Sequence, residues 1–146
     1  MKKELQEFKE LFESSPNIAI LNIDNGLEEI SSFLQEFTHQ NQGELHQKNI
    51  QEVHPRFRLK DRNFEYAVIS DCLNSVETQE EFINGVYHSL ENSAFIILLE
   101  KKQSSSIAKM YELLDTCNFR AINSIDIFPS YNLVMAKKLH MWGAGQ

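Results

Sequence analysis

The sequence predicts one α/β domain, with a mostly parallel β-sheet, helices on both faces and an antiparallel pair of strands near the C-terminus. Three observations predict this class. Segments of strand length alternate with segments of helical periodicity along the chain. The strand segments are continuously apolar, which is typical of strands that are covered on both faces. The last two strands are separated by a turn too short for a parallel crossover, so they must be antiparallel.

The first half of the chain is expected to contain two helices and two strands. Pro16 disfavours a helical residue before it and so ends the first helix. Asn25 and Glu28 have the spacing of a capping box at the start of the second helix. The expected elements are an amphipathic N-terminal helix at 1–15, a strand at 17–23, a helix at 27–40 and a modest strand at 44–50.

The second half is patterned more clearly. Thr78 and Glu81 have the spacing of another capping box, and Ser104 to Ser106 offer N-caps for a later helix. Pro129 and Ser130 form the turn between the final strands. The expected elements are a strand at 66–70, a helix at 78–90, a strand at 94–100, a helix at 107–117 and strands at 121–128 and 131–139.

Length and charge limit the possible functions. A chain of 146 residues has room for one domain, which we place at residues 1–146. Lys and Arg number 14 and Asp and Glu number 21, so the formal net charge of −7 argues against general affinity for nucleic acid or anionic membrane. The first residues lack the apolar core of a signal peptide, and no apolar run approaches the ~18 residues of a membrane span. We therefore expect a soluble, cytoplasmic protein.

The segment Phe64-Glu65-Tyr66-Ala67-Val68-Ile69-Ser70-Asp71-Cys72-Leu73-Asn74-Ser75-Val76-Glu77 opens a distinctive order of elements: strand, helix, apolar strand, helix and hairpin. This order, over residues 64–139, resembles the second half of the class I S-adenosylmethionine-dependent methyltransferases, and the quoted segment is similar to that family's fourth strand. The resemblance implies a three-layer Rossmann-like sandwich. In the family the strand order is 3-2-1-4-5-7-6 and strand 7 is antiparallel.

The stretch Asn22-Ile23-Asp24-Asn25-Gly26-Leu27-Glu28 occupies the place of the family's first motif, an acid followed by Gly-x-Gly-x-Gly. Only Gly26 falls on a glycine position. Asn22 stands at the acid position, and Asp24 and Glu28 stand at the other two glycine positions. Glycines in this motif let the backbone approach the cofactor. The resemblance thus implies S-adenosylmethionine as cofactor, with Asn22, Asp24 and Gly26 beside it.

The first half is shortened. The interval from Ile18 to Tyr66 lacks about one strand–helix unit, which takes upwards of ~30 residues. Counting backward from Phe64, the resemblance places Glu52 at the acid that faces the adenine after the third strand. The missing unit would then be the second strand, whose terminal acid holds the ribose hydroxyls, and no residue is assigned to that role.

Asp71 and Asn74 are the candidate catalytic residues. They follow a strand at the carboxyl edge of the sheet, where ligands of open α/β sheets bind, and the resemblance places them near the methyl-transfer centre. The alternative is that they are only loop and helix-cap residues. Cys72, between them, is interpreted as a buried apolar residue rather than a nucleophile. The two cysteines and five histidines lack metal-ligand spacing, so no metal site is expected.

A local basic segment is the candidate partner site. Arg56, Arg58, Lys60 and Arg62 alternate with other residues, so an extended backbone presents four cations on one side. This segment would bind an acidic partner protein, a phosphate-bearing ligand or the chain's own acidic surface. The alternative is a solvated edge strand whose charge prevents aggregation. Trp142, close to the C-terminus, is expected either to pack on the domain or to contact another subunit. Formation of a homo-oligomer is therefore an open alternative.

Two functions therefore compete. One is a small S-adenosylmethionine-dependent methyltransferase of unknown substrate. The other is a non-catalytic relative that keeps the sheet and serves as a protein-interaction or assembly module. The resemblance favours the first, whereas the altered glycine loop and the missing unit favour the second.

Overall fold

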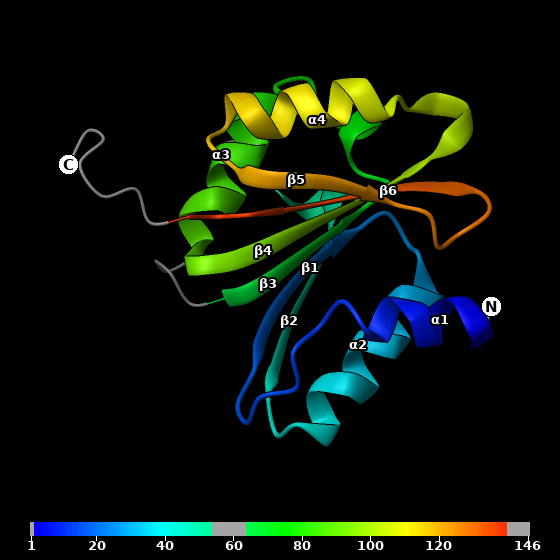
Figure 1. Cartoon of the computed structure of the whole chain (residues 1–146), viewed down its shortest axis with the longest axis vertical. Helices are drawn as coiled ribbons and strands as arrows, with labels where there is room; N and C mark the ends of the chain where they lie inside the picture. Colours follow the sequence, from blue (N-terminus) through cyan, green and yellow to red (C-terminus); the bar gives the residue numbers. More distant parts are fainter. Residues whose placement is uncertain (1, 54–63, 140–146) are drawn as a thin grey trace.

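A computed structural model describes residues 2–53 and 64–139. Its elements alternate along the chain as expected (Figure 1). In chain order they are α1 (Lys2–Lys9), β1 (Ala19–Asp24), α2 (Glu28–Gln40), β2 (Glu44–Asn49), the 3-10 helix η1 (Ile50–Glu52), β3 (Phe64–Ser70), η2 (Leu73–Ser75), α3 (Gln79–Ser89), β4 (Leu90–Lys101), η3 (Lys102–Ser104), α4 (Ile107–Thr116), β5 (Arg120–Ile125) and β6 (Tyr131–Lys137).

The strands form one six-stranded sheet in the order β2-β1-β3-β4-β6-β5. The neighbours from β2 to β4 are parallel, whereas β6 is antiparallel to both β4 and β5. Strand β6, the last strand among the described residues, is thus inserted between β4 and β5. The predicted class, a mostly parallel sheet closed by an antiparallel C-terminal hairpin, is confirmed.

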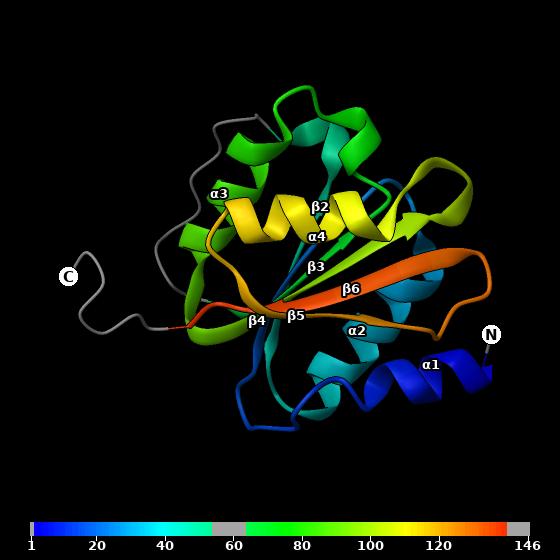
Figure 2. The same cartoon turned by 45° about the horizontal axis from the view of Figure 1, so that its top comes forward.

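Helices cover both faces of this sheet (Figures 1 and 2). Helices α3 and α4 lie over one face, where Phe82, Leu114 and Phe119 are fully buried against alternate strand residues. Helices α1 and α2 lie over the other, where Phe8 and Phe12 pack with ring centroids 5.2 Å apart. Because successive strand residues point to opposite faces, the continuous apolar runs fill both layers of core.

The place of the missing unit differs from the prediction. Strand β2 pairs directly with β1, with Ala19 opposite Glu44 and Asp24 opposite Asn49. The position beside β1, which the family's second strand occupies, is therefore filled. Among residues 2–53 and 64–139 no strand lies beyond β2. The prediction that the second strand is missing was wrong, and the outermost, third position is the one without a strand in the described part of the chain.

The helix starts also differ in detail. No side-chain cap bond is formed at Leu27, the N-cap of α2, so the predicted Asn25–Glu28 capping box is absent. Thr78 is the N-cap of α3, yet its hydroxyl does not cap the helix. Ser106 does cap α4, because its Oγ accepts a hydrogen bond from the backbone N–H of Lys109 at 3.3 Å. The first helix ends at Lys9, well before Pro16, although turns continue to Phe12.

The basic segment with Arg56, Arg58, Lys60 and Arg62 lies outside the described residues, as does Trp142. None of the described helices has the length and apolar character needed to cross a membrane.

Candidate functional site

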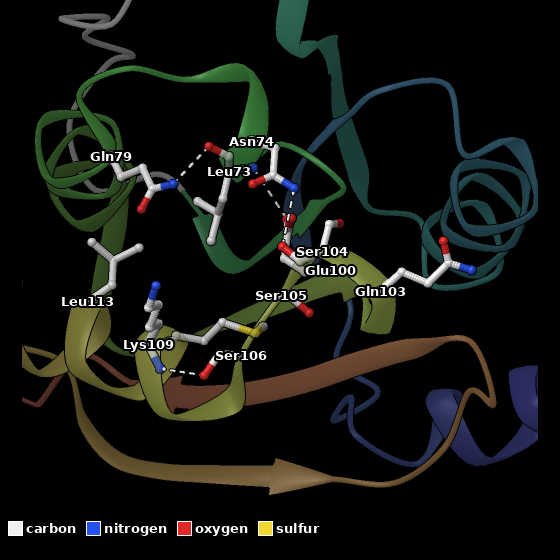
Figure 3. Close-up of a pocket in the computed structure, with 11 residues that line it drawn as sticks. Leu73, Asn74, Gln79, Glu100, Gln103, Ser104, Ser105, Ser106, Lys109 and Leu113 are labelled. Atoms are coloured by element: carbon white, nitrogen blue, oxygen red, sulfur yellow. Dashed lines mark hydrogen bonds between the residues drawn. The ribbon is translucent and has the colours of Figure 1, made fainter.

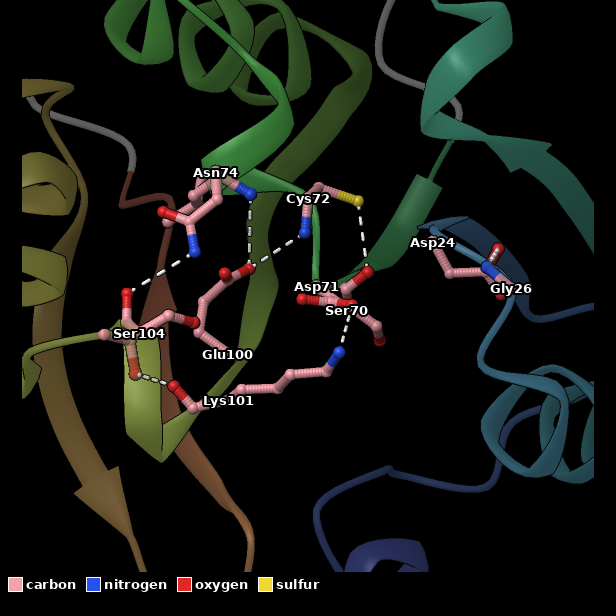
Figure 4. A network of polar contacts seen from close by, with 11 residues as sticks. Asp24, Gly26, Ser70, Asp71, Cys72, Asn74, Glu100, Lys101 and Ser104 are labelled. Carbon is pink, nitrogen blue, oxygen red and sulfur yellow. Dashed lines mark hydrogen bonds and ion pairs between the residues drawn. The ribbon is translucent and has the colours of Figure 1, made fainter.

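The carboxyl ends of four adjacent strands are level with one another. Asp24 of β1 is in register with Asn49 of β2 on one side and with Ser70 of β3 on the other, and Ser70 is in register with Leu99 of β4. The loops that follow these strands therefore open from one edge of the sheet (Figure 4). In open α/β sheets this edge is where ligands bind.

The loop after β1 is held by its first residue. Asp24, 4% exposed, accepts a hydrogen bond through Oδ1 from the backbone N–H of Gly26 at 3.2 Å. Gly26 has φ +89°, a conformation that favours glycine, and a Cβ built on it meets no atom within 4 Å. The predicted residues Asp24 and Gly26 are thus brought together, and the space beside the glycine is open.

Asn22 lies deeper than the loop. Its side chain is fully buried, and its Nδ2 donates to Oε1 of Gln47 on β2 at 2.7 Å. Oδ1 of Asn22 and Oγ of Ser70 are buried, with no hydrogen-bond partner among the described residues. Asp24 lies two residues after Asn22 and is in register with Ser70, so the side chains of Asn22 and Ser70 point to the same face of the sheet. This is the face covered by α2. Buried oxygens of this kind are usually satisfied by a water or a ligand.

Glu52 ends the short helix that follows β2. Its Oε1 accepts from the backbone N–H of Asn49 at 3.1 Å, and Asn49 Oδ1 accepts from the N–H of Gln51 at 2.9 Å. The two side chains close a capping box, and Glu52 is exposed. Since β2 lies beside β1, Glu52 and Asn49 stand at the strand end that the resemblance assigns to the ribose rather than to the adenine.

The loop after β3 is fastened to the end of β4. Asp71 has φ +56°, its backbone N–H donates to the carbonyl of Leu99, and its carboxylate pairs with Lys101 Nζ at 3.4 Å. Asn74 is exposed, and its Nδ2 donates to the carbonyl of Ser104 at 3.4 Å. The predicted residues Asp71 and Asn74 are thus near each other, and each has a contact with residues at or just beyond the end of β4.

Glu100 is the residue of this site that sequence reasoning missed. It is 1% exposed, and its Oε2 accepts from the backbone N–H groups of Cys72 at 3.0 Å and Leu73 at 3.3 Å (Figure 4). Burial, which outweighs these two bonds, raises the pKa of the Glu100 carboxyl, and the nearby Asp71 charge acts in the same direction. A Glu closing the most apolar strand was the one signal that could have drawn attention to it.

Cys72 is buried, as predicted, and its Sγ lies 3.3 Å from the Ile23 carbonyl oxygen and 3.2 Å from that of Ser70. Burial raises the pKa of this thiol far above its ordinary value, so the thiolate needed for nucleophilic chemistry is not formed. Within residues 2–53 and 64–139, no three His, Cys, Asp or Glu side chains come together in a way that could hold a metal ion.

A cavity of about 460 Å³ lies between the loop after β3 and the first turn of α4 (Figure 3). Glu100 and Asn74 line it, together with Lys109 of α4. Its remaining lining consists of Leu73, Gln79, Gln103, Ser104, Ser105, Ser106, Met110 and Leu113. The candidate catalytic residue Asn74 therefore lines a space large enough for a small molecule.

Several solved structures with a similar arrangement are methyltransferases. One from Aquifex aeolicus matches with a TM-score of 0.75 at 9% sequence identity, over 92% of this chain and 89% of that one. Phosphoethanolamine N-methyltransferase 2 of Haemonchus contortus, solved with phosphomonomethylethanolamine and S-adenosylhomocysteine, matches with a TM-score of 0.74 at 10% identity, over 95% of this chain and 53% of that one. The CurJ carbon methyltransferase matches with a TM-score of 0.73 at 11% identity, over 93% and 52%.

These similarities establish the fold: the chain has the class I S-adenosylmethionine-dependent methyltransferase fold. The chain spans about half the length of the Haemonchus and CurJ proteins. The sequence itself matches no protein-family model and no curated protein. The family expectation drawn from the order of elements is therefore confirmed at the level of fold, and the chemistry depends on the site.

Proposed function

We propose that this protein binds S-adenosylmethionine at the carboxyl edge of the sheet and transfers its methyl group to a small acceptor. The observation that carries the proposal is the open backbone at Gly26, where a side chain would meet nothing within 4 Å. A glycine with φ +89°, two residues after the end of β1, gives a ligand access to the main chain, which is the purpose of glycines at this turn.

The neighbouring strand ends offer the remaining contacts. Asp24 would lie beside the bound cofactor and add negative charge, which attracts a sulfonium cation. Ser70 has a buried hydroxyl without a partner among the described residues, so a ligand group or a bridging water would satisfy it. Glu52 and Asn49 would take the ribose end, provided that the carboxylate leaves its bond to the Asn49 N–H.

S-adenosylmethionine, when bound, supplies an electrophilic methyl group on its sulfonium sulfur. Methyl transfer requires mainly alignment of an acceptor with that group. Asp71 and Asn74 are proposed to position the acceptor, because they lie on the loop that Glu100 and Lys101 fasten to β4. A loop fixed at several points holds a bound molecule in one orientation at low entropic cost.

Calorimetric titration with S-adenosylhomocysteine tests the cofactor step. A site that binds it stabilises the fold by RT ln(1 + [L]/Kd), about 2.7 kcal/mol at one hundred times Kd. The variants Gly26→Ala and Gly26→Leu are a matched pair, because both suffer the same backbone strain but only leucine fills the space. We expect Gly26→Leu to bind much more weakly than Gly26→Ala at equal stability. No heat and no thermal shift at millimolar ligand would exclude the cofactor.

The second candidate is a non-catalytic relative that acts as an interaction module. It is favoured by the way the protein uses its own polar groups: Asn22 bonds to Gln47, and Glu52 bonds to Asn49. An adenosine site whose contacts are already made inside the protein binds weakly. In this case the partner would be an acidic protein or phosphate ligand, and the sequence supports Arg56, Arg58, Lys60 and Arg62 as its contacts.

Neutralising Arg56, Arg58 and Arg62 together distinguishes this candidate. The triple variant should lose any protein partner that the wild type retains in a pull-down, while its response to S-adenosylhomocysteine stays that of the wild type. Retention of the partner by the triple variant would remove the basic segment from the proposal.

A further inference from the structure

The cavity beside α4 has a carboxylate in its wall that the protein only half satisfies. Glu100 Oε2 accepts two backbone N–H groups, whereas no hydrogen bond to Oε1 is formed by the described residues. The side chain is 1% exposed and yet lines the cavity. A nearly buried carboxylate oxygen is costly without a donor, so this wall favours a ligand that brings a cation or an N–H group.

Lys109 lies on another wall of the same cavity. Figure 3 shows its side chain directed from α4 into the space, below Leu73 and Gln79. Lys109 belongs to the first turn of α4, where the helix dipole adds positive potential. This part of the cavity therefore favours an anionic group.

The two opposite charges do not neutralise each other. Ion pairs within the described residues include neither Glu100 nor Lys109; Lys101, which follows Glu100, is directed to Asp71 instead. A carboxylate and an ammonium that share a cavity without meeting are complementary to a molecule that carries both charges at separate ends.

The rest of the lining sets the size and polarity of such a molecule. The amides of Asn74, Gln79 and Gln103 and three serines provide neutral donors and acceptors. Apolar lining is limited to Leu73, Met110 and Leu113. A volume of about 460 Å³ with this lining suits a small polar ligand better than a lipid or a large aromatic compound.

We propose that this cavity binds a small zwitterion, with its ammonium group at Glu100 and its anionic group at Lys109 and the start of α4. The anionic group is a carboxylate or a phosphonate-like group, since both match an ammonium and a helix N-terminus. That this zwitterion is the methyl acceptor is a further step, and it rests on the proposed function.

Titration of the ¹⁵N-labelled full chain with four probes tests the site. β-Alanine and 2-aminoethylphosphonate carry both charges, whereas propionate and propylamine carry one each. The NH₂ signals of Asn74, Gln79 and Gln103 report on the cavity directly. We expect these signals to move with a zwitterion at concentrations about tenfold below those needed for either single-charge probe. Equal response to all four probes, or no response, would overturn the proposal, and the better zwitterion identifies the anionic group.

Three variants assign the contacts. Glu100→Gln keeps an oxygen for the two loop N–H groups but removes the charge, and Lys109→Met keeps the apolar stem. Each should weaken zwitterion binding about tenfold or more. Lys102→Met is the matched control, because Lys102 is exposed nearby but does not line the cavity, and it should bind as the wild type does. Should Glu100→Gln disturb the loop, Lys109→Met alone still decides; wild-type affinity in Lys109→Met would overturn the assignment.

The outcome is separate from that of the cofactor titration. Zwitterion binding without any response to S-adenosylhomocysteine would leave the cavity site standing and remove the methyl-transfer function. S-adenosylhomocysteine binding without zwitterion binding would remove the cavity site and leave the proposed cofactor site standing.

Discussion

The carboxylate of Glu100 lies 3.0 Å from the backbone nitrogen of Cys72, a residue 28 positions earlier in the chain. This bond joins the end of β4 to the loop after β3, and a second one, to the Leu73 N–H at 3.3 Å, reinforces it. The loop begins at Asp71, whose φ of +56° turns the chain away from the sheet. One buried side chain therefore fixes the loop that carries both candidate catalytic residues, Asp71 and Asn74.

Removing this carboxylate should destabilise the protein. Glu100→Ala leaves two buried N–H groups without an acceptor, so we expect the free energy of unfolding at pH 7 to fall by about 2–4 kcal/mol. Glu100→Gln keeps an accepting oxygen and should recover most of this loss. Urea unfolding of the three proteins measures the difference. Equal stability of the alanine and glutamine variants would contradict the role of the two bonds.

Glu100 should also make stability depend on pH. Burial raises the pKa of its carboxyl in the native state, so the folded protein holds this proton to higher pH than the unfolded chain does. Its contribution is complete below the ordinary carboxyl pKa and is lost as pH rises through the raised native pKa.

Measured against Glu100→Gln, which does not titrate, the wild type should lose free energy of unfolding as pH rises above the ordinary carboxyl pKa of about 4. Urea midpoints of both proteins across this range provide the test. A wild type that gains stability relative to the glutamine variant over the same range would reverse the sign and refute the assignment.

Two glycines should respond differently to substitution. A Cβ on Gly43 would overlap the backbone carbonyl of Ile18, the group that accepts the first β2 hydrogen bond from Glu44 at 2.8 Å. We expect Gly43→Ala to cost more than about 3 kcal/mol, because backbone atoms must move. Gly26→Ala meets no atom and should cost about 1–2 kcal/mol, the strain of positive φ. Thermal unfolding compares the pair, and a larger loss in Gly26→Ala would contradict the geometry.

Lys138 should matter more than its neighbour Lys137. It is 6% exposed, its Nζ donates to the carbonyls of Tyr87 at 2.9 Å and Leu90 at 2.8 Å, and it lies 4.5 Å from the Tyr87 ring centroid. Lys138→Met should lower the free energy of unfolding by about 2–3 kcal/mol, because carbonyls at the end of α3 lose a charged donor.

Lys137→Met is the control. Lys137 Nζ lies 5.3 Å from the Phe95 ring centroid, and a cation–π contact of this kind contributes about 0.5–1 kcal/mol. Amide hydrogen exchange in the last turn of α3 should accelerate in Lys138→Met and stay unchanged in Lys137→Met. Similar exchange in both variants would show that Lys138 does not hold the helix end.

The fold was predictable because its sequence signals are local, or depend only on the order of neighbouring elements. Apolar runs such as 94–100 identified the strands, and the short turn at Pro129 required an antiparallel final pair. The two capping boxes failed because spacing alone fixes neither the first residue of a helix nor the direction of a side chain: Leu27, rather than Asn25, is the N-cap of α2, and the Thr78 hydroxyl does not cap α3.

The site was less predictable because its contacts are distant in sequence. Nothing local in Glu100 shows that it accepts from Cys72 and Leu73, and nothing local in Lys138 shows that it reaches Tyr87. The same limit applied to the missing unit, since only the pairing of Asp24 with Asn49 reveals which sheet position is filled. Contact across the fold, rather than spacing, decides these roles.

The insertion of β6 between β4 and β5 has a consequence for biosynthesis. During elongation on the ribosome, residues 131–137 emerge after the other five described strands, and until then the edge of β4 from Phe95 to Lys101 has no pairing partner on that side. Such an edge invites pairing with other nascent chains. The sheet is therefore incomplete until late in translation, and a chain that stopped before residue 131 would keep this edge of β4 unpaired, a condition that favours aggregation.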